Sequence, residues 1–267
     1  MTADNLTCRR GLRLCTWHSA LRIAVGAALS WLAAPGPAWA FGSSGVRIWL
    51  PEAITTTAPV IDRLFYIVLV ITGVAFVLVQ ATLLLFILRY RRRPGRTAAY
   101  THGNQLAEVI WTIVPAVILV WLTFKSQRVW SQVRGTPPPP ELEVEIQGEQ
   151  FAWNIRYAGA DGALNTADDI TTINQLHLPV GRTVLVHLKS KDVIHSFFVP
   201  QFRMKQDAVP GLTTRLWVNA TKTGHYEIAC AELCGLGHYR MRGYLVIESP
   251  EALKTWLDER WTEQQAG

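Results

Sequence analysis

The segment CAELCGLGHYRM, from Cys230 to Met241, concentrates metal-binding side chains in one short stretch. It carries two thiols, an imidazole and a thioether, together with the carboxylate of Glu232. Thiolate, imidazole and thioether are soft and borderline ligands, and this combination suits copper. Away from the N-terminal cysteines Cys8 and Cys15, the chain has no other thiol. The chemistry that these residues could perform therefore involves this one loop.

Three kinds of site could account for the two cysteines. Neighbouring thiols in an oxidising compartment usually form a disulfide, and the pair taken alone favours that interpretation. A zinc site would use cysteine and histidine but has no use for the thioether of Met241. A blue copper site combines one cysteine with two histidines and a weak axial methionine on a β-sandwich. The nearby His238 and the upstream His195, in DVIHSFFVP, favour metal over a disulfide.

The second thiol offers something that a blue copper site lacks. Two thiolates can bridge two copper ions, each of which keeps one terminal histidine. Met241 on one side and a main-chain carbonyl on the other would fill the remaining positions. Such a pair can share one electron with little change in geometry, and it leaves no open position for a substrate. The loop therefore predicts an electron relay.

Composition indicates a membrane protein. Hydrophobic residues make up 49% of the 267-residue chain and charged residues only 17%, which is unusual for a soluble domain. The net charge is +6, but a nucleic-acid-binding protein would show a basic face with interleaved aromatics. Here the one dense basic run, RYRRRPGR, lies between two apolar blocks. We therefore expect no nucleic-acid partner.

Two segments are long enough to span a bilayer. Residues 64–88 contain no charge, and as a helix they would extend about 37 Å, against a hydrocarbon core of ~30 Å. The second apolar block runs from Leu106 to Phe124 within a predicted transmembrane helix at 106–127, and its Pro115 is tolerated better in a membrane helix than in water. The connection, 89–105, has five arginines and no acidic residue, so the positive-inside rule places it in the cytoplasm. We predict a transmembrane hairpin with both ends outside.

The N-terminus supports the same orientation. Residues 1–40 hold a basic region, a short apolar run and the small residues of PAWA, which together predict an export signal cleaved after Ala40. A further transmembrane helix is the alternative, but the apolar run is short and is followed closely by prolines. Residues 41–63 then form an exported segment. We expect a bacterial-type plasma (inner) membrane location, with both termini of the mature chain on the periplasmic side.

The pattern changes to β after the second apolar block. A Pro-rich linker, 128–140, ends in GTPPPP and leads into residues 141–249, where short alternating segments predict a β-sandwich or barrel. These segments are ELEVEI, FAWNIRY, RTVLVHL, TRLWV, HYEIA and GYLVIE. Residues 250–267 predict a closing helix and tail, with Ser249 as N-cap and Pro250 in the first turn. The acidic loop DGALNTADD fails the EF-hand spacing and is interpreted as a solvated connection.

Together these features resemble subunit II of haem-copper cytochrome c oxidases of the dinuclear copper type. The resemblance covers nearly the whole chain after residue 40. The resemblance rests on the two helices, the proline spacer, DVIHSFFVP, KQDAVPG and the highly specific pattern C-x-E-x-C-G-x-x-H-x-x-M. It implies a two-helix transmembrane hairpin plus an all-β cupredoxin-like sandwich.

The resemblance also implies a function and a site. The chain would accept single electrons from an external cytochrome c-type donor and pass them to subunit I, which reduces oxygen to water with proton pumping. Subunit III is a further expected partner. Magnesium, shared with subunit I, would bind the Glu232 side chain. The dinuclear copper ligands would be His195, Cys230, Cys234, His238, Met241 and the main-chain carbonyl of Glu232.

Two further positions carry family roles. Glu108, in EVIWTIVP, matches the family's E-x-x-W-T-x-x-P, whose glutamate stands at the mouth of a proton path. The alternative is a glutamate without a role, because a charged side chain near the membrane interface costs little free energy. Many members have Gln-Trp-x-Trp where the first tryptophan accepts the electron. This chain has Phe151 there and keeps Trp153, which is expected in the core. Lys191 precedes Asp192 where members often have an acidic pair, so we expect a weaker acidic docking patch.

Other classes fit less well. A quinol oxidase subunit II shares the architecture but lacks the copper ligands, which are intact here. A membrane-anchored copper-binding or copper-delivery protein needs exposed, exchangeable ligands, whereas this loop is flanked by apolar strand residues. The copper site of nitrous oxide reductases has the same ligands, but the large catalytic domain of those enzymes is not found. The absence of C-x-x-C-H means that the electron donor is a separate protein.

Overall fold

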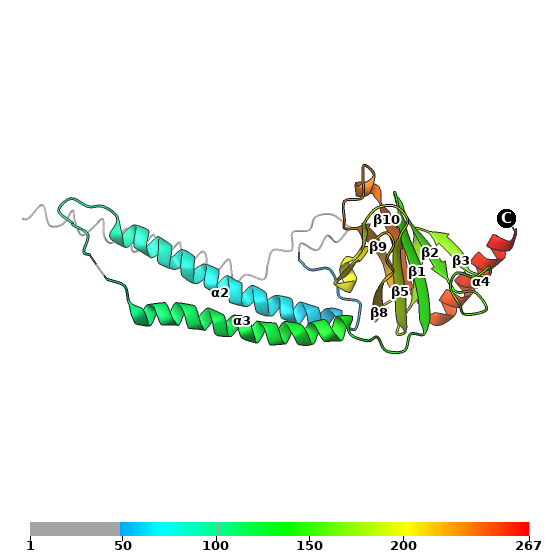
Figure 1. Ribbon diagram of the computed structural model, residues 1–267, viewed down its shortest axis with the longest axis horizontal. Helices are drawn as coiled ribbons and strands as arrows, with labels where there is room; N and C mark the ends of the chain where they lie inside the picture. Colours follow the sequence, from blue (N-terminus) through cyan, green and yellow to red (C-terminus); the bar gives the residue numbers. More distant parts are fainter. Residues whose placement is uncertain (1–48, 101, 267) are drawn as a thin grey trace, which may run out of the picture. The chain divides into compact units, whose positions relative to one another are not determined.

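The computed structural model describes residues 49–100 and 102–266. The predicted export signal, residues 1–40, lies outside the described residues. In the described part, the chain begins with two long helices and continues into two five-stranded sheets and a final helix (Figure 1). The predicted fold class, a hairpin of apolar helices followed by an all-β sandwich, is confirmed.

The two helices have the surface of membrane spans. Helix α2 covers Ala58–Tyr90 and α3 covers Gln105–Arg134, and their most apolar windows have mean hydropathies of 2.6 and 2.1. None of either window is buried within the protein. A core helix of a soluble protein would bury such side chains, so these apolar surfaces are suited to lipid or to another membrane subunit. Helix α3 continues through Pro115.

Both helices extend beyond the apolar segments that mark them in the sequence. Helix α2 begins at Ala58, six residues before the uncharged run. Residues 128–134, assigned by the sequence to a linker, are instead the last two turns of α3, and the extended segment starts only at Gly135. Loss of hydrophobicity marks the edge of the membrane, whereas a helix ends where glycine or proline stops it.

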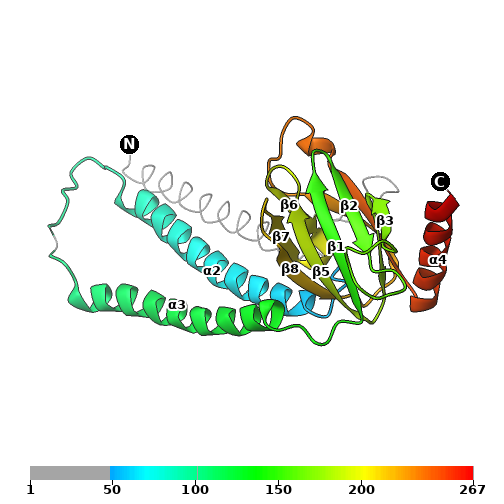
Figure 2. The same ribbon diagram turned by 45° about the vertical axis from the view of Figure 1, so that its right-hand side comes forward.

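The sandwich contains ten strands in two sheets (Figure 2). One sheet has the order β3-β2-β1-β5-β8 and the other has the order β4-β10-β9-β6-β7. Within each sheet most neighbours are antiparallel, but β1 pairs with β5, and β4 with β10, in parallel. The strands are β1 Leu142–Glu149, β2 Ala152–Tyr157, β3 Ile170–Ile173, β4 Gln175–Pro179, β5 Thr183–Ser190, β6 His195–Val199, β7 Met204–Ala208, β8 Thr214–Asn219, β9 Gly224–Cys230 and β10 Arg242–Glu248.

The alternation of each strand builds the core between the sheets. In β5 the buried positions alternate with half-buried ones, and β2 shows the same period of two, which is the expected pattern when one face packs and the other meets solvent. Trp153, Tyr157 and Phe197 are among the largest fully buried side chains. The resulting packed layer is the rigid support for the loops at its ends.

All six segments that the sequence predicted as strands are present. Strands β3, β4, β6 and β7 did not appear among those predictions; β3, β4 and β7 lie at sheet edges, whereas β6 is a central strand with four of its five positions buried and therefore no alternation. These three edge strands are only four or five residues long, and an edge strand needs no continuous apolar face because solvent lies beside it. Short edge strands therefore carry a weak period-two signal.

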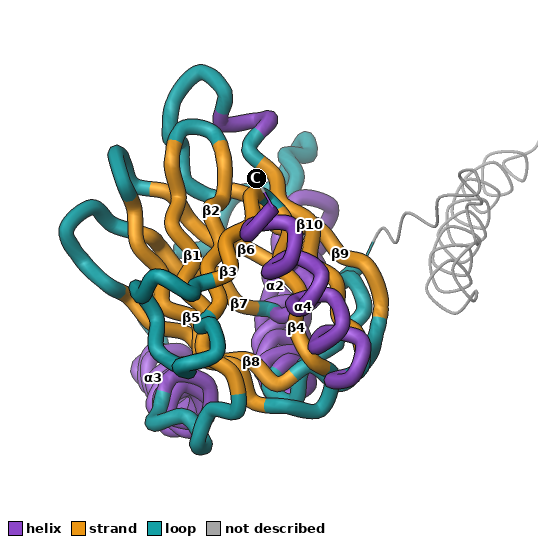
Figure 3. The backbone as a smooth tube through the Cα atoms, turned by 90° about the vertical axis from the view of Figure 1, so that its right-hand side faces the viewer, coloured by secondary structure: helices purple, strands orange, loops and turns teal. Residues whose placement is uncertain are grey.

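A last helix, α4 Pro250–Ala266, packs against the edge of the sandwich beside β4 and β3 (Figure 3). The predicted N-cap is confirmed, because the Ser249 hydroxyl accepts a hydrogen bond from the Ala252 N–H at 3.2 Å. Trp256 stacks on the His177 ring with 3.7 Å between ring centroids. This stack attaches α4 to β4.

Candidate metal centre

The sulfur-rich loop connects two central strands. It leaves β9 at Cys230, passes through a 3-10 turn at His238–Arg240 and joins β10 after Met241 (orange in Figure 2). The Cys230 N–H donates to the Met241 carbonyl at 3.3 Å, which closes the base of the loop. His195 begins the neighbouring strand β6, where Phe197 pairs with Cys230. Strand pairing therefore places the distant histidine beside the cysteines.

The candidate ligands form a continuous row centred on two sulfurs. The Cys230 Sγ and Cys234 Sγ atoms are 3.8 Å apart. Cys230 Sγ lies 4.0 Å from His195 Nδ1, and Cys234 Sγ lies 3.6 Å from His238 Nδ1. Each sulfur thus has one imidazole nitrogen beside it.

Two weaker donors complete the row. The Glu232 carbonyl oxygen is 3.2 Å from Cys230 Sγ, and Met241 Sδ is 3.7 Å from Cys234 Sγ. The carbonyl is therefore beside one sulfur and the thioether beside the other.

The cysteines are separate thiols in this structure. Their 3.8 Å separation is far longer than a disulfide bond of about 2.05 Å. His195, Cys230 and Cys234 present ligand atoms that all lie within 4.8 Å of one another, a spacing that could hold metal. The disulfide interpretation is therefore not the arrangement found here.

Burial changes the acidity of this pair. His195 is fully buried, and Cys234 and Met241 are 3% and 2% exposed. Burial, together with the neighbouring Cys230 thiol, raises the pKa of Cys234 to about 11. Without a metal the Cys234 thiol keeps its proton at neutral pH, so metal binding at this position releases a proton.

Asp192 orients His195, a role that the sequence analysis missed. The His195 Nε2 atom lies 2.8 Å from Asp192 Oδ1, which leaves Nδ1 directed at the cysteines. Burial raises the pKa of Asp192, but hydrogen bonds from His195 and from the N–H groups of Gln150 and Val193 outweigh it and hold that pKa below its usual value. A carboxylate on the second nitrogen of a ligating histidine fixes the ring and its tautomer. Its position three residues before His195 was the available signal.

Asp192 is exposed, but its carboxylate is engaged in local hydrogen bonds. Its carboxylate faces His195 and the Gln150 N–H, which is 2.7 Å from Oδ2. Lys191 forms an ion pair with Glu149 at 2.6 Å. The Gln150 amide donates to the Cys234 carbonyl, so the β1–β2 turn also supports the ligand loop.

The two aromatic candidates have different environments. Trp153 is fully buried, and its ring contacts His195 and Phe197 edge-on with centroid distances of 6.0 and 5.8 Å. Phe151 is 37% exposed and lies against the ligand loop, so closely that a Cβ added at Gly237 would clash with its ring. Phe151 is thus the aromatic at the surface, and Trp153 belongs to the core as expected.

The remaining candidates lie apart. The Glu232 side chain is exposed next to the ligand row. Glu108 is exposed in the first turn of α3, where Asn104 caps the helix through the Ala107 N–H at 3.1 Å. A carboxylate is favourable at that end of a helix dipole. The structure does not bring Glu108 near the other candidate residues.

The donor set fits a soft metal. Two thiolates, two imidazoles, a thioether and a carbonyl are suited to copper, and a zinc site would leave the thioether unused. The fold and the site therefore define a class, a membrane-anchored cupredoxin-like domain with a candidate copper site.

Comparisons with known proteins define the family. Residues 142–249 match "Cytochrome C oxidase subunit II, periplasmic domain", and residues 43–129 match "Cytochrome C oxidase subunit II, transmembrane domain". The chain is similar to cytochrome c oxidase subunit 2 of Thermostichus vulcanus, with 33% identity over 78% of this chain and 77% of the relative. It is also similar to the alternative cytochrome c oxidase subunit 2 of Bradyrhizobium diazoefficiens, with 35% identity over 80% and 84%.

A solved structure shows a weaker likeness. The periplasmic domain of subunit II of cytochrome oxidase from Bradyrhizobium japonicum aligns with 48% of this chain and 99% of its own, at 27% identity and a TM-score of 0.42. The sequence relatives suffice for the assignment. The chain belongs to the cytochrome c oxidase subunit II family.

Proposed function

We propose that this chain relays single electrons from an external cytochrome c-type donor to the haem-copper subunit I of its oxidase, where oxygen is reduced to water with proton pumping. One observation carries the proposal: two free cysteine sulfurs, 3.8 Å apart, with one histidine beside each. That arrangement offers two equivalent positions that share both sulfurs.

The ligands of a dinuclear copper centre would be His195, Cys230, Cys234, His238, Met241 and the Glu232 carbonyl. Bound copper would supply a one-electron store at this place. The protein's own part is to hold both imidazoles through Nδ1, to keep the sulfurs adjacent and to exclude water. Burial of His195, Cys234 and Met241 supports this role, because a dry, fixed ligand set changes little when charge changes.

Burial also argues against copper delivery, the alternative function. A delivery protein passes its metal on through exposed ligands, whereas three of these side chains are almost fully enclosed. Resistance of the bound copper to a mild chelator is expected for the relay, and rapid loss of copper would favour delivery.

We place the surface for the external donor over Phe151, which is exposed against the ligand loop. The exposed Glu232 carboxylate is proposed as a ligand to a magnesium ion shared with subunit I. The Glu232 residue would then offer its carbonyl to copper and its side chain to magnesium. Subunit III is a further proposed partner.

The proposed topology has two passes. Residues 1–40 act as an export signal, the arginine-rich loop stays in the cytoplasm, and the copper domain and both mature termini lie in the periplasm of a bacterial-type inner membrane. Support comes from the five arginines of residues 89–105, a segment that has no acidic residue.

Glu108 is proposed to stand at the cytoplasmic mouth of a proton path into subunit I. Its exposure at the first turn of α3 leaves it available to a neighbouring subunit. Replacement Glu108→Gln keeps the shape and removes the charge. We expect slower oxygen reduction with an unchanged copper spectrum; unaltered turnover would remove this role.

The test of the central proposal is electron paramagnetic resonance of the purified full-length chain loaded with copper. Two copper ions per chain and hyperfine structure from both nuclei are expected. A spectrum of a single copper nucleus, or a cystine link without metal, would refute the bridged site.

A further inference from the structure

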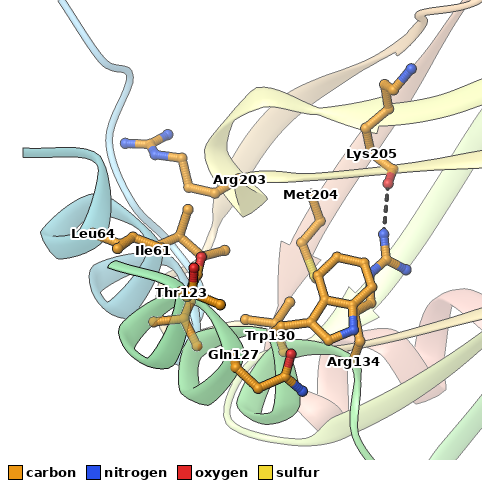
Figure 4. Close-up of a pocket in the computed structure, with 12 residues that line it drawn as sticks. Ile61, Leu64, Thr123, Gln127, Trp130, Arg134, Arg203, Met204 and Lys205 are labelled. Carbon is orange, nitrogen blue, oxygen red and sulfur yellow. Dashed lines mark hydrogen bonds between the residues drawn. The ribbon is translucent and has the colours of Figure 1, made fainter. Parts of the chain in front are cut away.

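A groove lies where the exported ends of the two helices meet strand β7. It has a volume of about 590 Å³, within the range of ligand clefts. The helices and the β6–β7 connection all contribute to its wall (Figure 4). Its lining residues are Ile61, Leu64, Thr123, Ser126, Gln127, Val129, Trp130, Val133, Arg134, Arg203, Met204 and Lys205.

One end of the groove reaches the membrane boundary. Leu64 is the first residue of the uncharged run of α2, and Thr123 lies in the last turn of the apolar run of α3. From there the apolar lining continues outward to Trp130 and the buried Met204. The Trp130 side chain is 61% exposed, and tryptophan is typical of the membrane–water interface. The groove is therefore a continuation of the lipid-facing surface.

The other end presents a guanidinium. Arg134 donates to the Gln206 side chain and to the Lys205 carbonyl, the latter at 2.8 Å (dashed in Figure 4). An arginine has five N–H donors, so three of them have no partner in the described part of the chain. The Arg134 guanidinium also lies 5.8 Å from the Trp130 ring centroid. It is half-buried, held in place and still able to bind an anion.

The surrounding charges are positive. Asp62 pairs with Arg203 at 2.7 Å and Asp207 pairs with Lys205 at 3.6 Å. In contrast Arg63, Lys125 and Arg128, on the same turns of the helices, have no carboxylate within ion-pair distance among the described residues, and neither has Arg134. The exported end of the hairpin therefore carries four uncompensated cations.

We propose that this groove binds one anionic phospholipid of the exported leaflet. The phosphate lies on Arg134, and an acyl chain follows Trp130 and Met204 toward Leu64 into the bilayer. A soluble anion would match the guanidinium but not the apolar lining, and a neutral lipid would leave Arg134, the unpaired cation of the lining, uncompensated. The assignment to the exported leaflet rests on the proposed topology.

The experiment uses photoactivatable lipids with the full chain in its oxidase complex. The complex is reconstituted in vesicles of phosphatidylcholine that contain a trace of diazirine-labelled phosphatidylglycerol, or of the equally labelled phosphatidylcholine. Crosslinked peptides are then mapped by mass spectrometry. We expect the phosphatidylglycerol probe to label peptides 123–134 and 203–206 in preference to the phosphatidylcholine probe.

Replacement of the guanidinium tests the phosphate contact. Arg134→Gln is expected to lower labelling of the groove roughly fivefold, the typical contribution of one cation near an anionic lipid surface. Arg134→Lys keeps the charge and is expected to restore most of the labelling. Lys254→Gln removes an exposed cation of α4, outside the groove, and should have no effect.

Three results would overturn the proposal. They are equal labelling by both probes in the unaltered protein, loss of labelling on adding inorganic phosphate, and crosslinks from the groove to another oxidase subunit instead of lipid. The comparison of probes needs no variant, so it decides the matter even if Arg134→Gln does not fold. The copper spectrum recorded on the same samples separates a failure of the lipid site from a failure of the electron relay.

Discussion

The Cys230–Met241 loop has two faces with opposite surroundings. On the inner face, Cys234 and Met241 are 3% and 2% exposed, together with fully buried His195. On the outer face Leu233, Leu236 and Tyr239 are 77%, 98% and 79% exposed. Polar and sulfur ligands are thus inside, and large apolar side chains are outside. We call these sets the ligand floor and the apolar crest.

Buried ligands on one face of the loop and exposed apolar side chains on the other indicate that the two faces have different roles. Exposed leucine is common as an isolated residue, but three large apolar side chains within seven positions, with Phe151 beside them, form a patch of the kind that binds other proteins. The floor beneath is held by hydrogen bonds from neighbouring strands. Under the proposed function, the inner face holds the metal and the outer face receives the donor, so changes to each should have separable effects.

The largest effect is expected from the floor. Cys234→Ser removes a sulfur that contacts Cys230, His238 and Met241. We expect loss of the two-copper spectrum and a fall in turnover beyond the roughly 10–100-fold typical of losing a supporting partner. Metal analysis and electron paramagnetic resonance measure this, with Leu233→Ser on the crest as the matched control. An intact two-copper spectrum in Cys234→Ser would contradict the assignment of copper binding to the ligand floor.

A smaller effect is expected from Asp192, which contacts the ligand His195 but is not itself a proposed copper ligand. Asp192→Asn weakens the 2.8 Å contact that orients His195, and copper affinity should fall about tenfold because the imidazole loses its anionic partner. Competition with a copper chelator measures the change. Glu149→Gln, which removes the half-buried partner of the exposed Lys191, is the control and should leave affinity unaltered. Equal affinities for both variants would show that Asp192 does not position the ligand.

The smallest effect is expected from the crest. Leu236→Ser should raise the KM for a soluble cytochrome c a few-fold, since an exposed apolar contact at an interface contributes about 1 kcal/mol, with kcat and spectrum unchanged. Tyr244→Ser, an exposed aromatic on β10, is the control. Steady-state oxidation of the cytochrome measures both.

In the same assay of cytochrome oxidation, Phe151→Trp is expected to speed the reaction, and no change would mean that the native donor uses another residue.

Residue types and local spacing by themselves determine much of this protein. The ligand loop is a single short segment, so its soft donors are identifiable from their types alone. The helical hairpin is also predicted from local sequence, because a run of about twenty apolar residues is long enough to span a bilayer. Period-two alternation identifies six of the ten strands in the described residues, those in which a packed face and a solvent face differ. Each of these signals depends on neighbours along the chain.

Tertiary structure decided the contacts between residues distant in sequence. Gln150 supports the Cys234 carbonyl from 84 positions away, and Arg134 reaches Gln206 across 72. No periodicity encodes such pairs, since the first arises where the two sheets face each other and the second where α3 lies beside β7. The same cause separated ligand floor from apolar crest: a loop's sequence gives its side chains, but only packing against the sandwich decides which of them water can reach.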